Sequence, residues 1–248
     1  MTSPKPDQPN PDQPNPDQAS AHQENPYHRE VFLEALRDCS DLSAERLWVE
    51  HQQMQLKFLL RRGLKPSTRL LDLGCGPMRL GAAVIPLLTT GWYVGQDLNP
   101  ETLAFGEEVL RRAGIAEQAN YTLLASERFD LSGVEGPFDL AFSNSLFSHL
   151  NLNSILTCLL QLKTVLKPQG VYYSTFFLAG SATEWLDPLD RNKWGRNFHT
   201  YAHQDPYHYT RSMMEAVAEE AGFRMDLVPD FGHPTQTMAR FRLRRRWW

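Results

Sequence analysis

Hydrophobic positions follow two alternating patterns along most of this chain. Short apolar runs, typical of buried strands, are separated by stretches in which apolar residues recur three or four positions apart, as on one face of a helix. Strands that alternate with helices indicate βαβ units and a mainly parallel sheet. The pattern predicts strands at 68–73, 92–97, 120–124, 138–142 and 171–177, with helices at 80–88, 100–113 and 153–166 between them.

After the fifth predicted strand, a long aromatic and polar segment interrupts the alternation at residues 179–209. A helix at 210–221 and two closing strands at 223–228 and 237–243 follow it. Arginine alternates with apolar residues in the last strand, which predicts an edge strand with one solvated face. The expected fold is α/β: a doubly wound, mostly parallel sheet of seven strands with helices on both faces.

The residues before the first strand form two segments of different character. Residues 1–24 are built around a PDQPN repeat with almost no apolar side chain to bury, so we expect a disordered tail. Residues 25–65 have a helical pattern and form an N-terminal helical extension. The main domain is then residues 66–248, and the segment 179–209 is long enough to serve as a cap over a site.

Composition narrows the class of protein without naming a function. The chain has 248 residues, 42% hydrophobic and 22% charged, with a formal net charge of −4. An acidic chain is not expected to bind nucleic acid or an anionic membrane as its main task. No apolar run is long enough for a membrane span, and no apolar leader begins the chain. The three cysteines lie far apart, which predicts reduced thiols, a cytoplasmic location and no metal site.

The first candidate site lies where the first two strands end. Gly74 and Gly76 follow the first strand, where glycine lets the backbone turn sharply and approach a ligand. Asp97 ends the second strand about 20 residues later, where an acidic side chain can accept both hydroxyls of a ribose. Asp97 could instead be a carboxylate that only precedes the next helix, which starts at Asn99-Pro100. The turn and the acid together predict a nucleoside site.

Two other functions compete with this interpretation. A nicotinamide dehydrogenase would carry a third glycine at position 79, where this chain has Arg79, so an NAD(P) site is weakened. A non-catalytic cofactor-binding or RNA-binding module could use the basic and aromatic C-terminus, Arg244 to Trp248. The intact glycine turn and Asp97 argue against a degenerate site.

Four stretches carry a family resemblance: LDLGCGPMRLG (71–81), YVGQDLNPETLAFG (93–106), FDLAFSNSLFSHL (138–150) and LKTVLKPQGVYYSTFF (162–177). Together they resemble the class I S-adenosylmethionine-dependent methyltransferases over about residues 45–240. The resemblance implies a methyltransferase domain at 66–248, with S-adenosylmethionine as the cofactor and a small molecule as the methyl acceptor.

The resemblance also implies where each part of the cofactor would lie. The methionine part would be lined by Asp72, near its ammonium, and by Gly74, Cys75 and Gly76. Arg79 would reach the methionine carboxylate or an acidic substrate.

The remaining implied contacts lie further along the chain. Asp97 would hold the ribose hydroxyls, and Leu98 would pack on adenine, with Glu127 beside it. Ser143 and Asn144, at the end of the fourth strand, would lie next to the methionine backbone.

One departure and two histidines bear on the acceptor. Family members that methylate adenine or glutamine nitrogen carry an (N/D)PP(Y/F) tetrapeptide after the fourth strand, whereas this chain has Ser-Asn-Ser-Leu at 143–146. We therefore expect methyl transfer at oxygen, where a hydroxyl acceptor needs a base to take its proton. His149, just after the fourth strand, and His208, in the cap segment, are the candidate catalytic residues. His149 could instead be a structural histidine that donates to a carbonyl group, and the segment that contains His208 could be an ordered surface insertion that only shields the core.

Overall fold

The computed structural model of the chain describes residues 42–193 and 196–244. The expected disordered tail, residues 25–41 of the N-terminal helical extension and the last four residues of the basic C-terminus lie outside the described residues. The chain divides into two units at Leu47, and the unit from Trp48 onward contains the whole sheet. The fold described below is that of this second unit.

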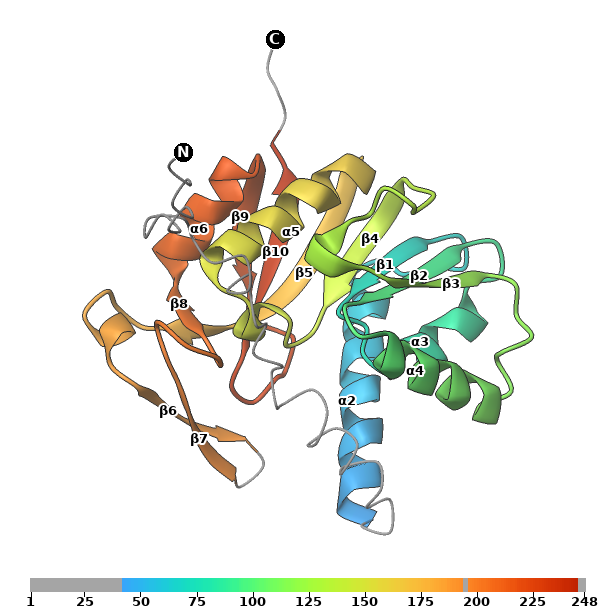
Figure 1. Cartoon of the computed structure of the whole chain (residues 1–248), viewed down its shortest axis with the longest axis horizontal. Coiled ribbons are helices and arrows are strands. Elements are labelled where there is room, and N and C mark those ends of the chain that lie inside the picture. Colours follow the sequence, from blue (N-terminus) through green and yellow to red (C-terminus); the bar gives the residue numbers. More distant parts are fainter. Residues whose placement is uncertain (1–41, 194–195, 245–248) are drawn as a thin grey trace, which may run out of the picture. The chain divides into compact units, whose positions relative to one another are not determined.

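A single large sheet organises the fold, with strand order β3-β2-β1-β4-β5-β10-β9 (Figure 1). The first five strands of the path pair in parallel and β10 pairs antiparallel to both of its neighbours, while β8 extends β5 off the path. The predicted doubly wound, mostly parallel sheet is confirmed, but it has eight strands rather than the seven predicted, because β8 pairs with the end of β5. Its strands are β1 (Arg69–Leu73), β2 (Trp92–Asp97), β3 (Tyr121–Ala125), β4 (Phe138–Ser143), β5 (Leu166–Ala179), β8 (His208–Thr210), β9 (Phe223–Val228) and β10 (Thr237–Leu243).

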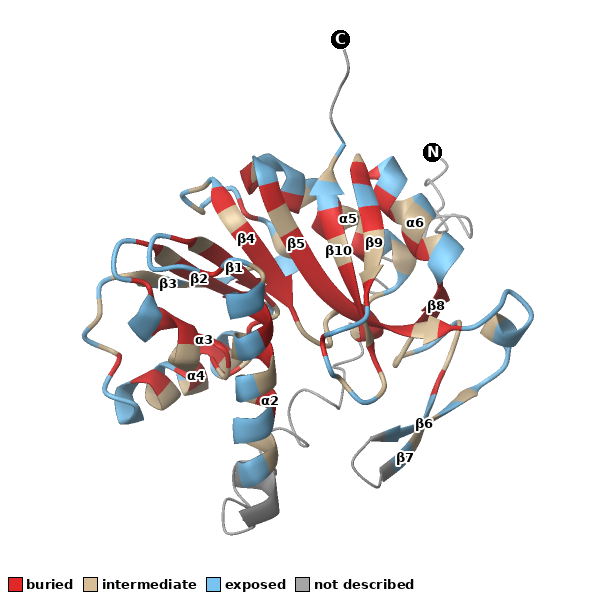
Figure 2. Cartoon of the chain, turned by 180° about the vertical axis from the view of Figure 1, so that it is seen from behind, coloured by how far each residue is buried: buried red, intermediate tan, exposed pale blue. Residues whose placement is uncertain are grey.

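Two hydrophobic cores, one on each face, hold the helices to this sheet. On one face, α5 (Leu152–Val165) and α6 (Arg211–Glu220) cover Tyr172 and Phe241 of the strands (Figure 1). On the other face, Phe58 of α2 (Leu42–Arg61) packs edge-on against Tyr173. Buried residues run along β1, β4, β5 and β10 in Figure 2. Helices therefore cover both faces, as a parallel sheet requires.

The prediction of an edge strand at the C-terminus is wrong. β10 lies between β5 and β9, and β9 is the edge strand. The alternation of arginine with apolar residues has another cause: Arg240 and Arg242 both bond to Asp226 of the neighbouring strand, on a face of the sheet that remains open to solvent at this end. Arginines that pair with a carboxylate on the next strand therefore give the same alternating sequence pattern as a solvated edge strand.

The predicted helix at 80–88 is shorter than expected. It consists of α3 (Gly81–Val84) followed by a 3₁₀ turn at Ile85–Leu87. Pro86 cannot donate the hydrogen bond that would continue an α-helix, which explains the early end. The helix after β2, α4 (Pro100–Arg112), begins as expected at Asn99, whose side chain accepts from the Glu101 and Thr102 N–H groups.

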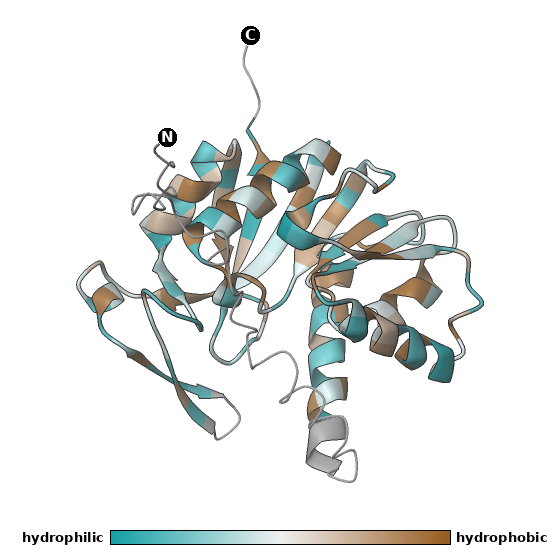
Figure 3. Ribbon diagram, viewed as in Figure 1, coloured by the Kyte–Doolittle hydropathy of each residue, from teal (hydrophilic) through white to brown (hydrophobic). Residues whose placement is uncertain are grey.

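The segment predicted as a long loop at 179–209 has secondary structure of its own. It contains a 3₁₀ turn at Glu184–Leu186 and a separate hairpin of β6 (Leu189–Lys193) and β7 (Arg196–Thr200). The hairpin is largely hydrophilic in Figure 3. The segment then returns to the sheet through β8 (Figure 1).

Candidate active site

The glycine turn after β1 lies directly against the end of β2. Gly74 and Gly76 have φ angles of +64° and +56°, in the left-handed region that glycine adopts without steric cost. Between them, the Cys75 N–H donates to the Gln96 carbonyl at 3.0 Å, and the Cys75 side chain is buried. Cys75 therefore takes part in the turn through its backbone, and burial raises the pKa of its thiol.

Asp97 connects this turn to the start of α4. Its Oδ2 accepts from the Gly76 N–H at 2.9 Å, and its Oδ1 accepts from the Asn99 N–H at 3.0 Å. Asn99 is the residue that caps α4, and Asp97 holds Asn99 and the glycine turn together. The alternative that Asp97 only precedes the helix does not account for its bond to Gly76. The two features that the sequence singled out, the glycine turn and the acid after β2, are in direct contact.

Asp72 is a buried carboxyl near the end of strand β1, with 3% of its surface exposed. The Tyr93 hydroxyl donates to its Oδ2 at 2.6 Å. Burial raises the pKa of Asp72 to about 7, the Tyr93 hydrogen bond opposes that rise, and the negative charge of Asp97 adds to it. A carboxyl in this state is stabilised in its charged form by a nearby cation. Tyr93 was not predicted, although it belongs to the strand next to the site.

The residues expected beside an adenine lie past the end of β2. Leu98 is an apolar side chain with 65% of its surface exposed, which suits contact with a flat ring. Glu127 begins the 3₁₀ turn at Glu127–Phe129 and is exposed. The Gln96 Nε2 donates to the Ser126 carbonyl at 2.9 Å and fixes this loop to β2. Gln96 was not predicted as a site residue from the sequence. The available signal was a polar side chain within the otherwise apolar second strand.

Arg79 lies with α2 rather than with Asp72 or Asp97. Its Nη1 donates to the Nδ1 of His51 at 3.1 Å, and its guanidinium stacks over the ring of Trp48 at 4.7 Å. The Gln52 side chain also donates to the Arg79 carbonyl at 2.6 Å. Burial lowers the pKa of Arg79 to about 10. Its neighbours come from a helix outside the motif, so the sequence did not indicate them.

The two residues predicted at the end of β4, Ser143 and Asn144, differ in what their side chains can offer a ligand. The Ser143 hydroxyl is fully buried and bonds to the Tyr172 hydroxyl at 2.8 Å and to Ser174 Oγ at 2.7 Å. Ser143 can therefore contribute only its backbone to a ligand. The Asn144 amide donates to Ser145 Oγ at 3.3 Å, and Asn144 Oδ1 is buried without a hydrogen-bond partner. Ser145 also accepts from the Gln236 amide at 3.1 Å.

His149 forms a close pair with a residue of the cap segment. Its Nδ1 lies 2.7 Å from Asp205 Oδ1, and the two side chains are 19% and 29% exposed. His149 ends the 3₁₀ turn at Phe147–His149, directly after β4. The Tyr207 N–H donates to the Ser148 carbonyl at 2.7 Å and fixes the cap segment to the same turn. Asp205 was missed because the pairing joins residues far apart in the chain.

His208 has its hydrogen-bonding groups engaged inside the protein. Its side chain is fully buried, with Nδ1 at 2.9 Å from Thr200 Oγ1 and Nε2 at 2.7 Å from the Trp185 carbonyl. A carbonyl only accepts, so Nε2 carries the proton and Nδ1 accepts from Thr200. Burial lowers the pKa of His208 and keeps the ring neutral. This geometry gives His208 a structural role inside the segment, in place of the catalytic role predicted for it.

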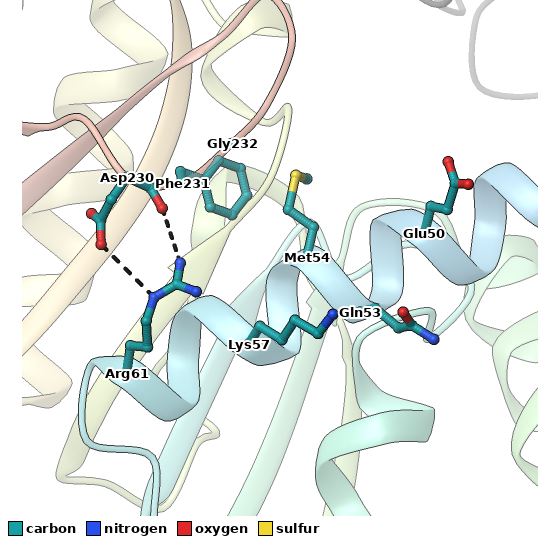
Figure 4. A pocket seen from close by; sticks show the side chains of 8 residues that line it. All are labelled: Glu50, Gln53, Met54, Lys57, Arg61, Asp230, Phe231 and Gly232. Carbon is teal, nitrogen blue, oxygen red and sulfur yellow. Dashed lines mark hydrogen bonds and ion pairs between the residues drawn. The ribbon is translucent and has the colours of Figure 1, made fainter.

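A shallow cavity of about 440 Å³ lies beside α2. Figure 4 shows Arg61 reaching Asp230 across it, at 2.9 Å to the carbonyl and 3.8 Å to the carboxylate. None of the predicted site residues lines this cavity, which is formed by Glu50, Gln53, Met54, Lys57, Arg61, Asp230, Phe231 and Gly232. Within the described part of the chain, no helix has the length and apolar character needed to cross a membrane.

Comparison with known proteins agrees with this geometry. A family model described as a methyltransferase domain matches residues 71–172, which include the glycine turn, Asp97 and the end of β4. The fold is similar to a S-adenosylmethionine-dependent methyltransferase from Clostridium acetobutylicum ATCC 824, with 12% identity and a TM-score of 0.60 over 86% of this chain and 99% of that one.

Two further solved structures share the fold and act on different atoms by their names. The mitomycin 7-O-methyltransferase MmcR is 16% identical, with a TM-score of 0.61 over 89% of this chain and 59% of that one. The glycopeptide N-methyltransferase MtfA, in complex with S-adenosyl-L-methionine, is 15% identical, with a TM-score of 0.57 over 78% of this chain and 94% of that one. The family match covers residues 71–172, and the fold of the chain is that of S-adenosylmethionine-dependent methyltransferases.

Proposed function

We propose that this protein transfers a methyl group from S-adenosylmethionine to an oxygen atom of a small molecule. The observation that carries the proposal is the contact between the Gly76 N–H and Asp97, which brings the glycine turn and the acid after β2 into one site. The pair formed by His149 and Asp205 supports oxygen as the acceptor atom.

The residues present fit this cofactor on three observations. Gly74 and Gly76 take left-handed φ angles, so the turn exposes its backbone without side chains. Asp72 is a buried carboxyl, and no cation of the described part of the chain pairs with it, which suits an ammonium group. Leu98 presents an exposed apolar surface that suits adenine. Asp97, Glu127, and the backbone of Cys75, Ser143 and Asn144 complete the proposed cofactor site.

The cofactor supplies an activated methyl carbon on a sulfonium when it is bound. The protein's contribution is to orient the acceptor, exclude water and handle its proton. Asp97 fixes the turn on which the cofactor would rest, because its two oxygens hold Gly76 and Asn99 in place. Because burial raises the pKa of Asp72 to about 7, a positively charged group bound at the end of β1 would favour the ionised form of this carboxyl.

His149 is the proposed general base for a hydroxyl acceptor. With Asp205 at Nδ1, the ring is fixed in orientation, and the imidazolium formed when Nε2 takes a proton is stabilised. We propose that the segment 179–209 acts as the cap that brings Asp205 to this position. His208 then belongs to the framework of the cap, since its ring joins Thr200 and Trp185.

The alternatives receive less support from the described residues. Helix α3 has only four residues, so it offers little of the helix N-terminus on which a dinucleotide pyrophosphate rests. In the basic C-terminal strand, Arg240 and Arg242 share Asp226, and Arg244 pairs with Glu219, which reduces their attraction for RNA. Two buried free thiols, Cys75 and Cys158, fit the cytoplasmic location that we propose.

Calorimetry and a methyl-transfer assay test this proposal in turn. We expect S-adenosylhomocysteine to bind and NAD to bind at least tenfold more weakly; the reverse order would contradict the proposal. Incubation of a metabolite extract with enzyme and labelled S-adenosylmethionine should then yield a labelled methyl ether or ester. His149→Ala should reduce transfer to a hydroxyl about 10²-fold or more, while His199→Ala, a substitution of an exposed histidine on β7, should not.

A further inference from the structure

Arg79 is a largely buried cation that has no carboxylate partner among the described residues. The guanidinium donates a hydrogen bond to His51 Nδ1 and stacks over the ring of Trp48. Its Nε is buried and has no hydrogen-bond partner. An enclosed charge that lacks an opposite charge is costly, so such groups are normally paired. The pairing group here is therefore expected to arrive with a ligand.

The chemistry of the neighbouring histidines leaves the positive charge on Arg79 alone. Arginine only donates, so His51 Nδ1 must accept from it and stays unprotonated. His233 Nδ1 likewise accepts from the backbone N–H groups of Thr235 at 3.2 Å and Gln236 at 2.9 Å. Any proton on either ring is then at Nε2, and both rings are neutral hydrogen-bond donors in this arrangement.

Aromatic rings continue from Arg79 toward the loop between β9 and β10. The His51 and His233 rings meet edge to face with centroids 5.7 Å apart. His233 in turn stacks parallel to Phe231, with centroids 6.4 Å apart. Flat, apolar surfaces next to a cation suit a ligand that has an aromatic body and a negative group.

Unpartnered polar atoms extend this cluster to the end of β4. Gln236 is only 8% exposed and donates to Ser145 Oγ, while its Oε1 has no hydrogen-bond partner. Thr235 Oγ1 and Asn144 Oδ1 are also buried without partners. Buried acceptors of this kind are normally satisfied, so the ligand is expected to bring a donor such as a hydroxyl.

We propose that Arg79, with the rings of Trp48, His51 and His233 and the amide of Gln236, forms the acceptor site, and that this site binds a hydroxylated aromatic carboxylate. Arg79 is then the counter-ion of the carboxylate and determines specificity for anionic acceptors. This inference rests on the proposed function, and it assigns Arg79 to the acceptor rather than to the methionine carboxylate of the cofactor.

The test uses the full chain saturated with S-adenosylhomocysteine and titrated with para-hydroxybenzoate. The neutral isostere para-hydroxybenzamide is the matched ligand. We expect the carboxylate to bind at least tenfold more tightly than the amide to the unsubstituted protein, a comparison that needs no variant. Equal affinities, or no binding of either, would overturn the inference. Failure of S-adenosylhomocysteine itself to bind would instead overturn the proposed function.

A variant then assigns the effect to Arg79. Arg79→Gln should remove the preference for the carboxylate and leave the affinity for S-adenosylhomocysteine within about twofold. Arg61→Gln, at an exposed arginine at the end of α2, should change neither. If Arg79→Gln weakens S-adenosylhomocysteine at least tenfold but leaves an analogue without the carboxylate unaffected, Arg79 holds the cofactor and the inference is wrong. Should Arg79→Gln fail to fold, Arg79→Lys, which keeps the charge, should retain part of the preference.

Discussion

At the scale of single residues, the proposed cofactor site depends most on Asp97. Its carboxylate accepts two backbone N–H groups, one from the glycine turn and one from the start of α4. A charged acceptor of this kind contributes about 1.5–3 kcal/mol per hydrogen bond. The same oxygens have further lone pairs to offer to ribose hydroxyls.

We predict that Asp97→Asn weakens S-adenosylhomocysteine binding at least tenfold, or about 1.4 kcal/mol. The amide offers one acceptor oxygen where two are used, and it removes the charge. Calorimetry measures the affinity, and thermal unfolding shows whether the fold is kept. Glu215→Gln, on the exposed face of α6, is the control and should bind normally. Unchanged affinity in a folded Asp97→Asn protein would remove Asp97 from the site.

Asp72 predicts a dependence of stability on pH. Its pKa is raised from 3.8 to about 7 by burial, so the folded state holds a proton that the unfolded state releases. Its contribution to stability is fully present below about pH 4 and is lost as pH rises through about 7. The loss is at most about 4 kcal/mol. Asp130, Asp139 and Asp226 have lowered pKa values, and their effects occur at more acidic pH.

We therefore expect the ligand-free protein to lose unfolding free energy between pH 5 and pH 7, measured by urea denaturation. Asp72→Asn should flatten that slope, because the amide mimics the protonated carboxyl and still accepts from Tyr93. Asp190→Asn, at a side chain that is 92% exposed, should leave the slope intact. Equal slopes in the unsubstituted protein and Asp72→Asn would show that Asp72 is charged in the folded protein.

The sequence could predict those residues whose position follows from strand order. Asp72, Gly74 and Asp97 follow or end neighbouring parallel strands, and the ends of such strands meet at one edge of a sheet. It could not predict what Arg79 or His149 would contact. Their partners, Trp48 and Asp205, come from α2 and from the cap segment, and no local pattern encodes that packing.

At the scale of elements, the glycine turn and α4 fit together through Met78. This residue takes a left-handed φ of 65° and is fully buried. A Cβ on Gly106 of α4 would lie 2.7 Å from Met78 Cγ, so the helix must have glycine there. The Met78 side chain thus packs the turn that carries Gly74 and Gly76 against α4.

We predict that Gly106→Ala destabilises the protein by about 1–3 kcal/mol through overpacking. In a Met78→Gly background the contact is absent, and the same change should be neutral or stabilising, because alanine favours a helix over glycine by about 1 kcal/mol. A double-mutant cycle in urea measures the coupling. Additive effects of the two substitutions would mean that the turn and α4 pack independently.

The cap segment is a second element whose role can be tested. His208 joins Thr200 at the end of the hairpin to Trp185 in the 3₁₀ turn, and both partners would lose a buried hydrogen bond without it. His208→Ala should cost about 2–4 kcal/mol and increase proteolytic cleavage within residues 181–207. His199→Ala, at an exposed histidine of β7, is the control and should keep the protease resistance of the unsubstituted protein.

Affinity for S-adenosylhomocysteine should remain within about twofold in His208→Ala. A variant that keeps its melting temperature and protease resistance but loses methyl transfer would show instead that His208 is catalytic.

At the scale of the whole molecule, the sheet was predictable and the position of its last strand was not. The five parallel strands could be predicted because each is a continuous apolar run bounded by turn residues. β10 was misplaced because Arg240 and Arg242 suggested a solvated face, whereas both side chains pair with Asp226 on β9. Long-range pairing of charges across strands leaves no periodic signal in one sequence.

A crystal structure with bound S-adenosylhomocysteine tests the central claim most directly. The account predicts the ribose hydroxyls within hydrogen-bonding distance of the Asp97 carboxylate and the amino-acid part on the turn at Gly74 and Gly76. Ligand density in the cavity beside α2, next to Arg61 and Asp230, with none at the glycine turn, would contradict it.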